Sequence, residues 1–189
     1  MTLKLKEILE YDDRIVELFL ESPLRYKRWD LNILDMPSKN YLFTIGVKEK
    51  AKFIEHFGEY KIFRYTAGDF SIDCFVTETN TVSFFQYKND NITCNIHKVW
   101  QDPITIGLNR KIILEYYLKI YDGVLTDNIH TELGEKSIRK LLNSAMDLGY
   151  KVFVVKNETE KTYIEDLDGI DQYYSYGADG LQYKFGIEK

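Results

Sequence analysis

The sequence predicts a mixed fold of the α+β or α/β class, and two observations lead to this prediction. Between Tyr60 and Trp100, apolar residues alternate with a period of two in short segments, as they do in half-buried strands. From Gly123 to Asn157 the pattern reads strand, long helix, strand, which is typical of a unit with parallel strands and a crossover connection. We therefore expect a mixed sheet with helices packed against it.

The first sixty residues are predicted to be largely helical. Apolar residues between Leu3 and Glu21 recur at spacings of three, four and seven, which favours an amphipathic helix that ends at Ser22-Pro23. A second, shorter helix is predicted from Val47 to Phe57, with Gly58 as its C-terminal stop.

Four short strands are expected next, because the segments are rich in β-branched and aromatic residues. They are Lys61–Ala67, Ser71–Thr77, Thr81–Lys88 and Ile92–Trp100. Their short connections permit only antiparallel neighbours, so the prediction is a four-stranded antiparallel meander. Cys74 and Cys94 fall on apolar faces of adjacent strands, which favours two buried thiols over a disulfide or a nucleophile.

The second half is predicted to alternate helices with strands. Asp102-Pro103 ends the meander, and Gly107 opens a helix that runs to Tyr121. The expected elements after it are a strand at Gly123–Thr126, a helix at Glu132–Leu148 capped by Thr131 and Gly149, a strand at Lys151–Val155, a strand at Thr162–Glu165, a helical turn at Asp168–Tyr174 and a strand at Leu181–Phe185.

Length and composition favour one domain over residues 1–189. We divide it into an N-terminal helical part (1–59), a core (60–156) and an acidic extension (157–189). The net charge of −5 resides in this extension, which has eight acidic and three basic residues. A neutral body with an acidic end argues against general nucleic-acid binding. Arg25–Trp29 interleaves basic and aromatic residues and could stack on bases, clamp an acidic partner or simply form a loop.

The sequence shows no signal for a metal, a leader peptide or a membrane span. Three His without CxxC or HExxH spacing make a structural metal site improbable. The N-terminal residues have no apolar core of a signal peptide, and nowhere do 18 apolar residues run together. We expect a soluble protein of the cytoplasm, without contact with a membrane.

The order of elements, an antiparallel meander, a helix and then strand-helix-strand, resembles the GNAT acyltransferase fold. The resemblance covers Tyr60–Lys156. It implies that the helix after the meander starts at the pyrophosphate of acyl-CoA, with Gly107, Leu108, Asn109 and Arg110 as the cofactor-binding residues. Of the family pattern Q/R-x-x-G-x-G/A, the chain retains only Gly107.

A second resemblance concerns the segment from Leu125 to Gly134. It is similar to the pattern L-S/T-D-x-x-Q/L-S/T-x-x-G of poorly characterised bacteriophage proteins. Those proteins often carry an aromatic residue near the middle of the helix that follows, where this chain has Arg139 and Lys140. The resemblance implies a phage origin. In the same loop, Asp127 and His130 could form an acid/base pair, since His titrates near neutral pH. The alternative is that Asp127 and Thr131 serve the helix start, because their oxygens bind free amides.

Two functions remain in view. The first is a phage-type accessory protein on a GNAT-like scaffold, either virion-associated or an inhibitor of a host or defence factor, with no cofactor and a basic protein partner. Its predicted contact residues are Asp168, Asp171, Tyr173, Tyr174, Tyr176 and Asp179, unless these tyrosines only seal the sheet edge. The alternative is a divergent acyl-CoA-dependent N-acyltransferase with His130 or Asp127 as the proton acceptor. Nucleic-acid binding is least favoured.

Overall fold

A computed structural model describes residues 51–67, 69–78, 81–102, 104–126, 132–157, 159–174 and 183–189. The chain divides into two compact units, Met1–Phe84 and Phe85–Lys189, with the boundary inside strand β4 (Thr81–Asn89). The predicted helix at Leu3–Glu21 and the basic segment Arg25–Trp29 lie outside the described residues. The expectation of a single domain therefore stays a prediction.

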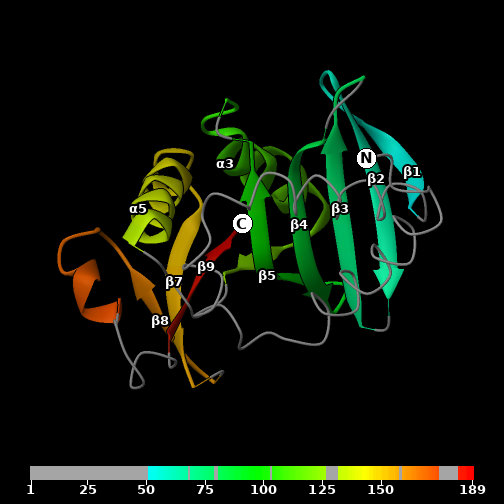
Figure 1. Cartoon of the computed structure of the whole chain (residues 1–189). Coiled ribbons are helices and arrows are strands. Elements are labelled where there is room, and N and C mark those ends of the chain that lie inside the picture. Colours follow the sequence, from blue (N-terminus) through cyan, green and yellow to red (C-terminus); the bar gives the residue numbers. More distant parts are fainter. Residues whose placement is uncertain are drawn as a thin grey trace, which may run out of the picture. The chain divides into compact units, whose positions relative to one another are not determined.

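The first unit contains an antiparallel sheet of β1 (Lys52–Phe57), β2 (Tyr60–Ala67) and β3 (Phe70–Val76) (Figure 1). The helix predicted over Val47–Phe57 is wrong, because the part that the structure describes is strand β1. Gly58 has φ 59° and makes a tight turn to Tyr60. A positive φ at the first central position of a two-residue loop, which glycine adopts readily, gives a turn whose twist matches that of the two strands in a hairpin. Pairing with β2 therefore overrides the helical spacing.

A buried ion pair joins β2 to β3. Arg64 and Asp73 are cross-strand partners, and Asp73 is fully buried. The guanidinium donates from Nε to Asp73 Oδ1 at 2.6 Å and from Nη2 to Oδ2 at 2.8 Å. Two parallel bonds of this kind satisfy a carboxylate that would otherwise be costly to bury.

The second unit is built on β4, β5 (Thr93–Gln101), β6 (Gly123–Leu125), β7 (Lys151–Lys156), β8 (Glu160–Ile164) and β9 (Tyr183–Glu188). Their order is β4-β5-β6-β9-β7-β8. β5 and β6 are parallel, whereas β9 is antiparallel to both β6 and β7. β6 and β7 are thus mutually parallel, as predicted, but the last strand of the chain lies between them.

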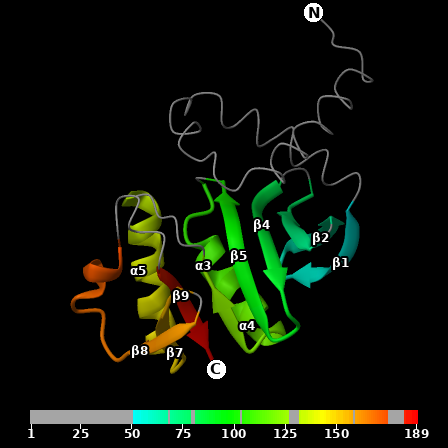
Figure 2. The same cartoon turned by 90° about the horizontal axis from the view of Figure 1, so that it is seen from below.

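The predicted helix from Gly107 to Tyr121 is confirmed as α3 (Leu108–Ile112), a π-helical turn η3 (Ile113–Tyr117) and α4 (Leu118–Ile120). Figure 2 shows these helices beside β5. The ring of Tyr117 is fully buried and lies 5.1 Å from that of Phe85 and 5.4 Å from that of Tyr87, in edge-on geometry. This aromatic packing attaches the helix to β4.

The second long helix is confirmed as α5 (Glu132–Asp147), which packs on β7. Its residues Leu141, Leu142 and Ala145 are buried. Gly149 has φ 83°, its N–H donates to Met146 O at 2.9 Å, and Tyr150 N–H donates to Ala145 O at 3.0 Å. This pair of bonds is a Schellman motif, so the predicted C-terminal stop is also confirmed.

The mixed fold class is confirmed, and so are the predicted strands that became β2 to β5. The tail also follows the prediction, with β8 and a 3₁₀ turn η4 (Ile170–Tyr173). Cys74 and Cys94 are both free and buried, as expected, although they lie in β3 and β5 rather than in consecutive strands. Ile92, predicted in a strand, is instead 61% exposed in the turn between β4 and β5. No helix of the described residues has the length and apolarity to span a membrane.

Gly186 should not tolerate a side chain, because it lies opposite Phe153 and beneath its ring. A Cβ there would lie 2.2 Å from Phe153 Cζ. We expect Gly186→Ala to lower the free energy of unfolding by about 1–3 kcal/mol, as overpacking does. Urea unfolding would measure this. The double variant with Phe153→Ala should lose less than the two single losses added, and strict additivity would contradict the clash.

The turn before β5 should make stability depend on pH through Asp90. Its Oδ1 accepts from Thr93 N at 2.6 Å and Ile92 N at 3.0 Å, and these bonds lower the pKa of Asp90 below its ordinary 3.8. A lowered folded-state pKa gives stability that is present above pH 3.8 and is lost as the pH falls through the folded-state value. Thermal unfolding between neutral and acidic pH should show Asp90→Asn losing this part of the pH dependence while it keeps an oxygen acceptor. An unchanged profile would contradict the role of Asp90.

Candidate functional site

The feature that organises the second unit is a fork between β5 and β6. The two strands pair only at Thr93 with Gly123, Cys94 with Val124, and Asn95 with Leu125. β6 then ends, while β5 continues to Gln101. Thr126 turns toward β9 instead: its N–H donates to Phe185 O at 2.8 Å, and its Oγ1 accepts from Phe185 N at 3.1 Å. The two strands therefore part beyond Asn95.

The loop between β5 and α3, residues 102–107, is held by its own polar groups. Asp102 Oδ1 accepts from Ile104 N at 2.9 Å, and Asp102 O accepts from Thr105 N at 2.9 Å. Leu108 N then donates to Thr105 O at 3.0 Å. Asn109 N donates to Gln101 Oε1 at 2.9 Å. Backbone donors at the start of α3 are thus already engaged within the segment.

These contacts test whether the predicted cofactor residues fit the pyrophosphate of acyl-CoA. Such a group requires open backbone amides and positive potential. The Leu108 and Asn109 amides are used internally, and Asp102 adds a carboxylate to the same loop. Gly107, with φ 84°, and Arg110 do lie together, since a Cβ on Gly107 would be 3.5 Å from Arg110 Nη2. One cation beside one glycine is too little, so the segment does not fit a pyrophosphate.

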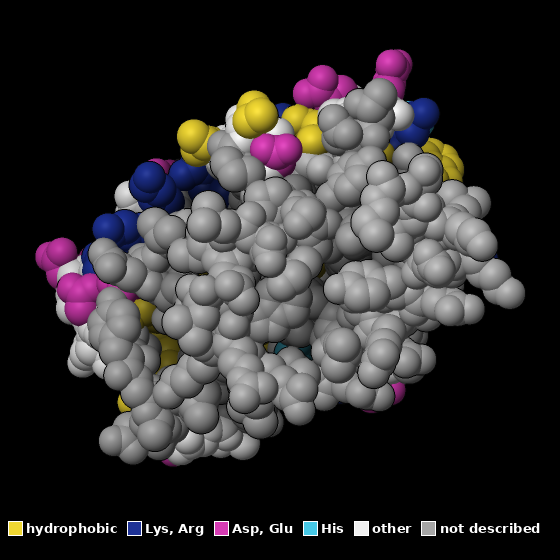
Figure 3. Space-filling view, in the orientation of Figure 1, with side chains coloured by type: hydrophobic (Ala, Val, Ile, Leu, Met, Phe, Trp, Pro, Cys, Tyr) yellow, Lys and Arg dark blue, Asp and Glu magenta, His cyan; other side chains and the backbone are white. Residues whose placement is uncertain are grey.

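The same loop presents apolar side chains to solvent. Ile104 is 89% exposed and Ile106 is 90% exposed. Hydrophobic side chains reach the surface along the upper edge of the molecule, above α3 in the orientation of Figure 1 (Figure 3). A loop fixed by internal hydrogen bonds and tipped with two isoleucines is suited to contact another apolar surface.

The predicted acid/base pair, Asp127 and His130, falls outside the described residues, as does the predicted cap residue Thr131. Their pairing stays a prediction. His97 lies on β5, two positions beyond the last β5–β6 pair. It is half-buried on the face opposite Cys94 and Ile96. The alternation of apolar residues predicted that His97 lies on the face opposite Cys94 and Ile96. The sequence did not predict that β5 and β6 separate near His97.

The predicted contact residues of the tail divide into two kinds. Asp168 and Asp171 are exposed, and Asp171 pairs with Arg139 of α5. The Tyr173 ring is half-buried, 5.4 Å from that of Tyr183. Tyr174 lies in the core, 4.9 Å from Phe185 between ring centres, and burial raises its pKa to about 12.

Tyr176 and Asp179 lie outside the described residues. Of the described set, the aspartates and the partly covered Tyr173 remain available for contact, whereas Tyr174 seals the sheet. No cluster of three or more potential metal ligands occurs in the described part of the chain.

Comparisons with known proteins found similarity at the level of structure. No family model and no curated protein matches the sequence. A putative GNAT-family acetyltransferase from Bacteroides thetaiotaomicron is 16% identical, with a TM-score of 0.38, over 64% of this chain and 62% of that protein. A GNAT-family acetyltransferase from Elizabethkingia anophelis with acetyl-CoA bound is 13% identical, with a TM-score of 0.37, over 68% of this chain and 96% of that one.

The matched region spans about three fifths of the Bacteroides protein. At this level of identity and superposition, neither activity nor cofactor is carried over to this chain.

Proposed function

We propose that this chain acts through protein contacts on a GNAT-like scaffold, and that the loop of residues 102–107 is a contact surface instead of a cofactor site. The observation that carries this proposal is the closure of that loop by Asp102 and Gln101, together with the exposure of Ile104 and Ile106. The segment that would receive a pyrophosphate is occupied by its own side chains.

The energetics of such a contact are favourable. Complete burial of an isoleucine side chain stabilises a complex by roughly 1.5–3 kcal/mol. Because the loop is already ordered by its own hydrogen bonds, little further entropy is lost when it binds. The partner that fits this tip has a small apolar depression that receives the two isoleucines.

The finer parts of the proposal come from the sequence. The L-S/T-D pattern suggests a phage origin, and an accessory role follows as a virion-associated component or as an inhibitor of a host or defence factor in the host cytoplasm. The exposed Asp168 and Asp171 support a partner with a basic surface. These features indicate a class of partner, and the experiments below test whether the loop of residues 102–107 contacts one.

A second candidate, a divergent N-acyltransferase, is favoured by the fork. Beyond Asn95, β5 runs on without β6, and His97 lies on this stretch. Histidine is the side chain most often used as a general acid or base. Gly107 and Arg110 could hold a single anionic group. This candidate comes second because the segment before α3 does not fit the pyrophosphate of acyl-CoA.

Calorimetry with acetyl-CoA distinguishes the two candidates. The contact proposal predicts no saturable heat up to millimolar acetyl-CoA, because loop amides and a carboxylate already fill the phosphate position. The matched control is Arg110→Ala, which should give the same flat titration. Saturable binding to the natural chain that disappears in Arg110→Ala would refute the contact reading of the loop and favour the acyltransferase.

Site-specific photo-crosslinking tests the contact surface directly. A crosslinking amino acid at position 106 should give a discrete adduct with one host or phage protein. The same probe at Ile92, which is 61% exposed on another turn, is the control and should give no such adduct. Ile104→Asp should abolish the adduct from position 106 and leave the melting temperature unchanged, because the side chain is almost fully exposed. Equal adducts from positions 92 and 106 would contradict the proposal.

A further inference from the structure

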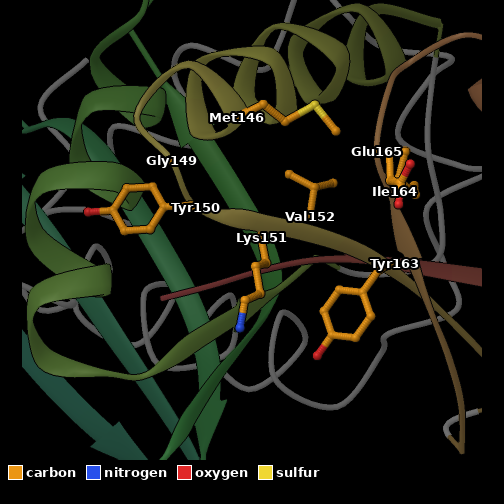
Figure 4. A pocket seen from close by; sticks show the side chains of 8 residues that line it. All are labelled: Met146, Gly149, Tyr150, Lys151, Val152, Tyr163, Ile164 and Glu165. Atoms are coloured by element: carbon orange, nitrogen blue, oxygen red, sulfur yellow. The ribbon is translucent and has the colours of Figure 1, made fainter.

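A groove of about 560 Å³ lies in the second unit, between the C-terminal end of α5 and the outer strands β7 and β8. Its lining residues are Met146, Gly149, Tyr150, Lys151, Val152, Tyr163, Ile164 and Glu165. Figure 4 shows Met146 and Val152 on one side of an open space and Ile164 and Glu165 on the other. The volume falls within the range of sites that hold small ligands or single anchoring side chains.

The floor of the groove is apolar, because two of its polar lining residues, Lys151 and Tyr163, point elsewhere. Lys151 and Tyr163 extend from the strands away from Met146 and α5 (Figure 4). Tyr163 donates its hydroxyl hydrogen to Glu188 Oε1 at 2.6 Å. Burial raises the pKa of Glu188, but the hydrogen bonds from Lys161 and Tyr163, together with the charges of Lys161 and Lys151, hold this pKa below its ordinary value. Met146 and Ile164, which are partly exposed, therefore define the surface that an occupant would touch, with the buried Val152 beneath them.

The rim of the groove is negative. The groove lies beside the C-terminal turn of α5, and a helix carries a partial negative charge at this end. The last turn of α5 has no basic residue, and its final residue is Asp147. Glu165 lines the groove and is followed directly by Asp166. Each of these three carboxylates is exposed. The last turn of α5 lacks the basic residues that commonly compensate the negative end of a helix.

An apolar side chain beside the groove is also exposed. Leu148, which follows the last residue of α5, is 63% exposed and directly precedes Gly149. The Schellman turn fixes this position, because the Gly149 and Tyr150 amides are bonded back to the helix. The groove thus has an apolar floor, an apolar lip and an acidic rim.

We propose that this groove docks a segment of a partner protein that carries one bulky apolar side chain flanked by lysine or arginine. Charge complementarity selects this occupant: the apolar side chain would lie on Met146 and Ile164, and the flanking cations would meet Asp147 and Glu165. A second copy of the chain is disfavoured, because its net charge of −5 would oppose association at an acidic rim. This surface deepens the proposed contact function and does not involve Ile104 or Ile106.

Titration with a blocked peptide of sequence Lys-Arg-Trp-Lys-Arg tests the docking. Amide resonances in ¹H–¹⁵N NMR spectra of the full chain should shift saturably at Gly149, Tyr150 and Glu165. Replacing the tryptophan by alanine, or the four basic residues by glutamate, should weaken binding by about tenfold or more, because the first change removes the anchor and the second repels the rim. Binding should also weaken with salt.

Matched variants of the protein complete the test. Glu165→Lys should weaken peptide binding by about tenfold, whereas Glu160→Lys, an exposed position at the other end of β8, should leave it unchanged. Equal losses in both variants, or equal binding of the glutamate peptide, would overturn the proposal. Sedimentation showing a dimer that Glu165→Lys disrupts would assign the groove to a second copy and would also overturn it. Ile104→Asp should leave peptide binding intact, so failure here is separable from failure of the loop contact.

Discussion

The second unit depends on the pairing of its last strand, β9, with both β6 and β7. β6 is only three residues long, and its partners on one side are Glu188, Ile187 and Gly186. The same β9 residues pair with Lys151, Val152 and Phe153 of β7. Through Phe185, β9 also draws Thr126 away from β5 and so creates the fork. Because these contacts join residues distant in sequence, closing them costs chain entropy, and contacts of this kind slow folding.

The loop before α3 and the groove beside α5 each lie at the end of a helix. At the loop, Asp102 and Gln101 supply acceptors to backbone amides of the loop and of α3. At the groove, the last turn of α5 has no basic residue, and the Gly149 and Tyr150 amides cap its carbonyl groups. Both features concern a few side chains at helix termini, where backbone groups lack internal partners.

The sequence predicted the parts of this fold that local chemistry determines. Period-two segments became β2 to β5, and Gly149 closed α5 as expected. The helix over Val47–Phe57 failed because apolar spacing in a short segment suits either structure, and the hairpin at Gly58 decided for a strand. The place of β9 could not be predicted, since a strand of six residues carries no signal for its neighbours. Of the candidate site, the sequence named Gly107 and Arg110, which lie together in the structure. The hydrogen bonds of Asp102 and Gln101, and the position of His97 where β5 and β6 separate, could be seen only in three dimensions.

The distribution of the two thiols has a practical consequence. The first unit holds Cys74 and the second holds Cys94, each fully buried in its core. Burial, and then the charge of Asp73, raises the pKa of Cys74, so its thiolate is scarce and it reacts only when the surrounding structure opens. The chain therefore carries a built-in chemical reporter in each unit. The relative alkylation rates of the two cysteines measure whether the units open together or one before the other, and thus whether they behave as one cooperative body or as two.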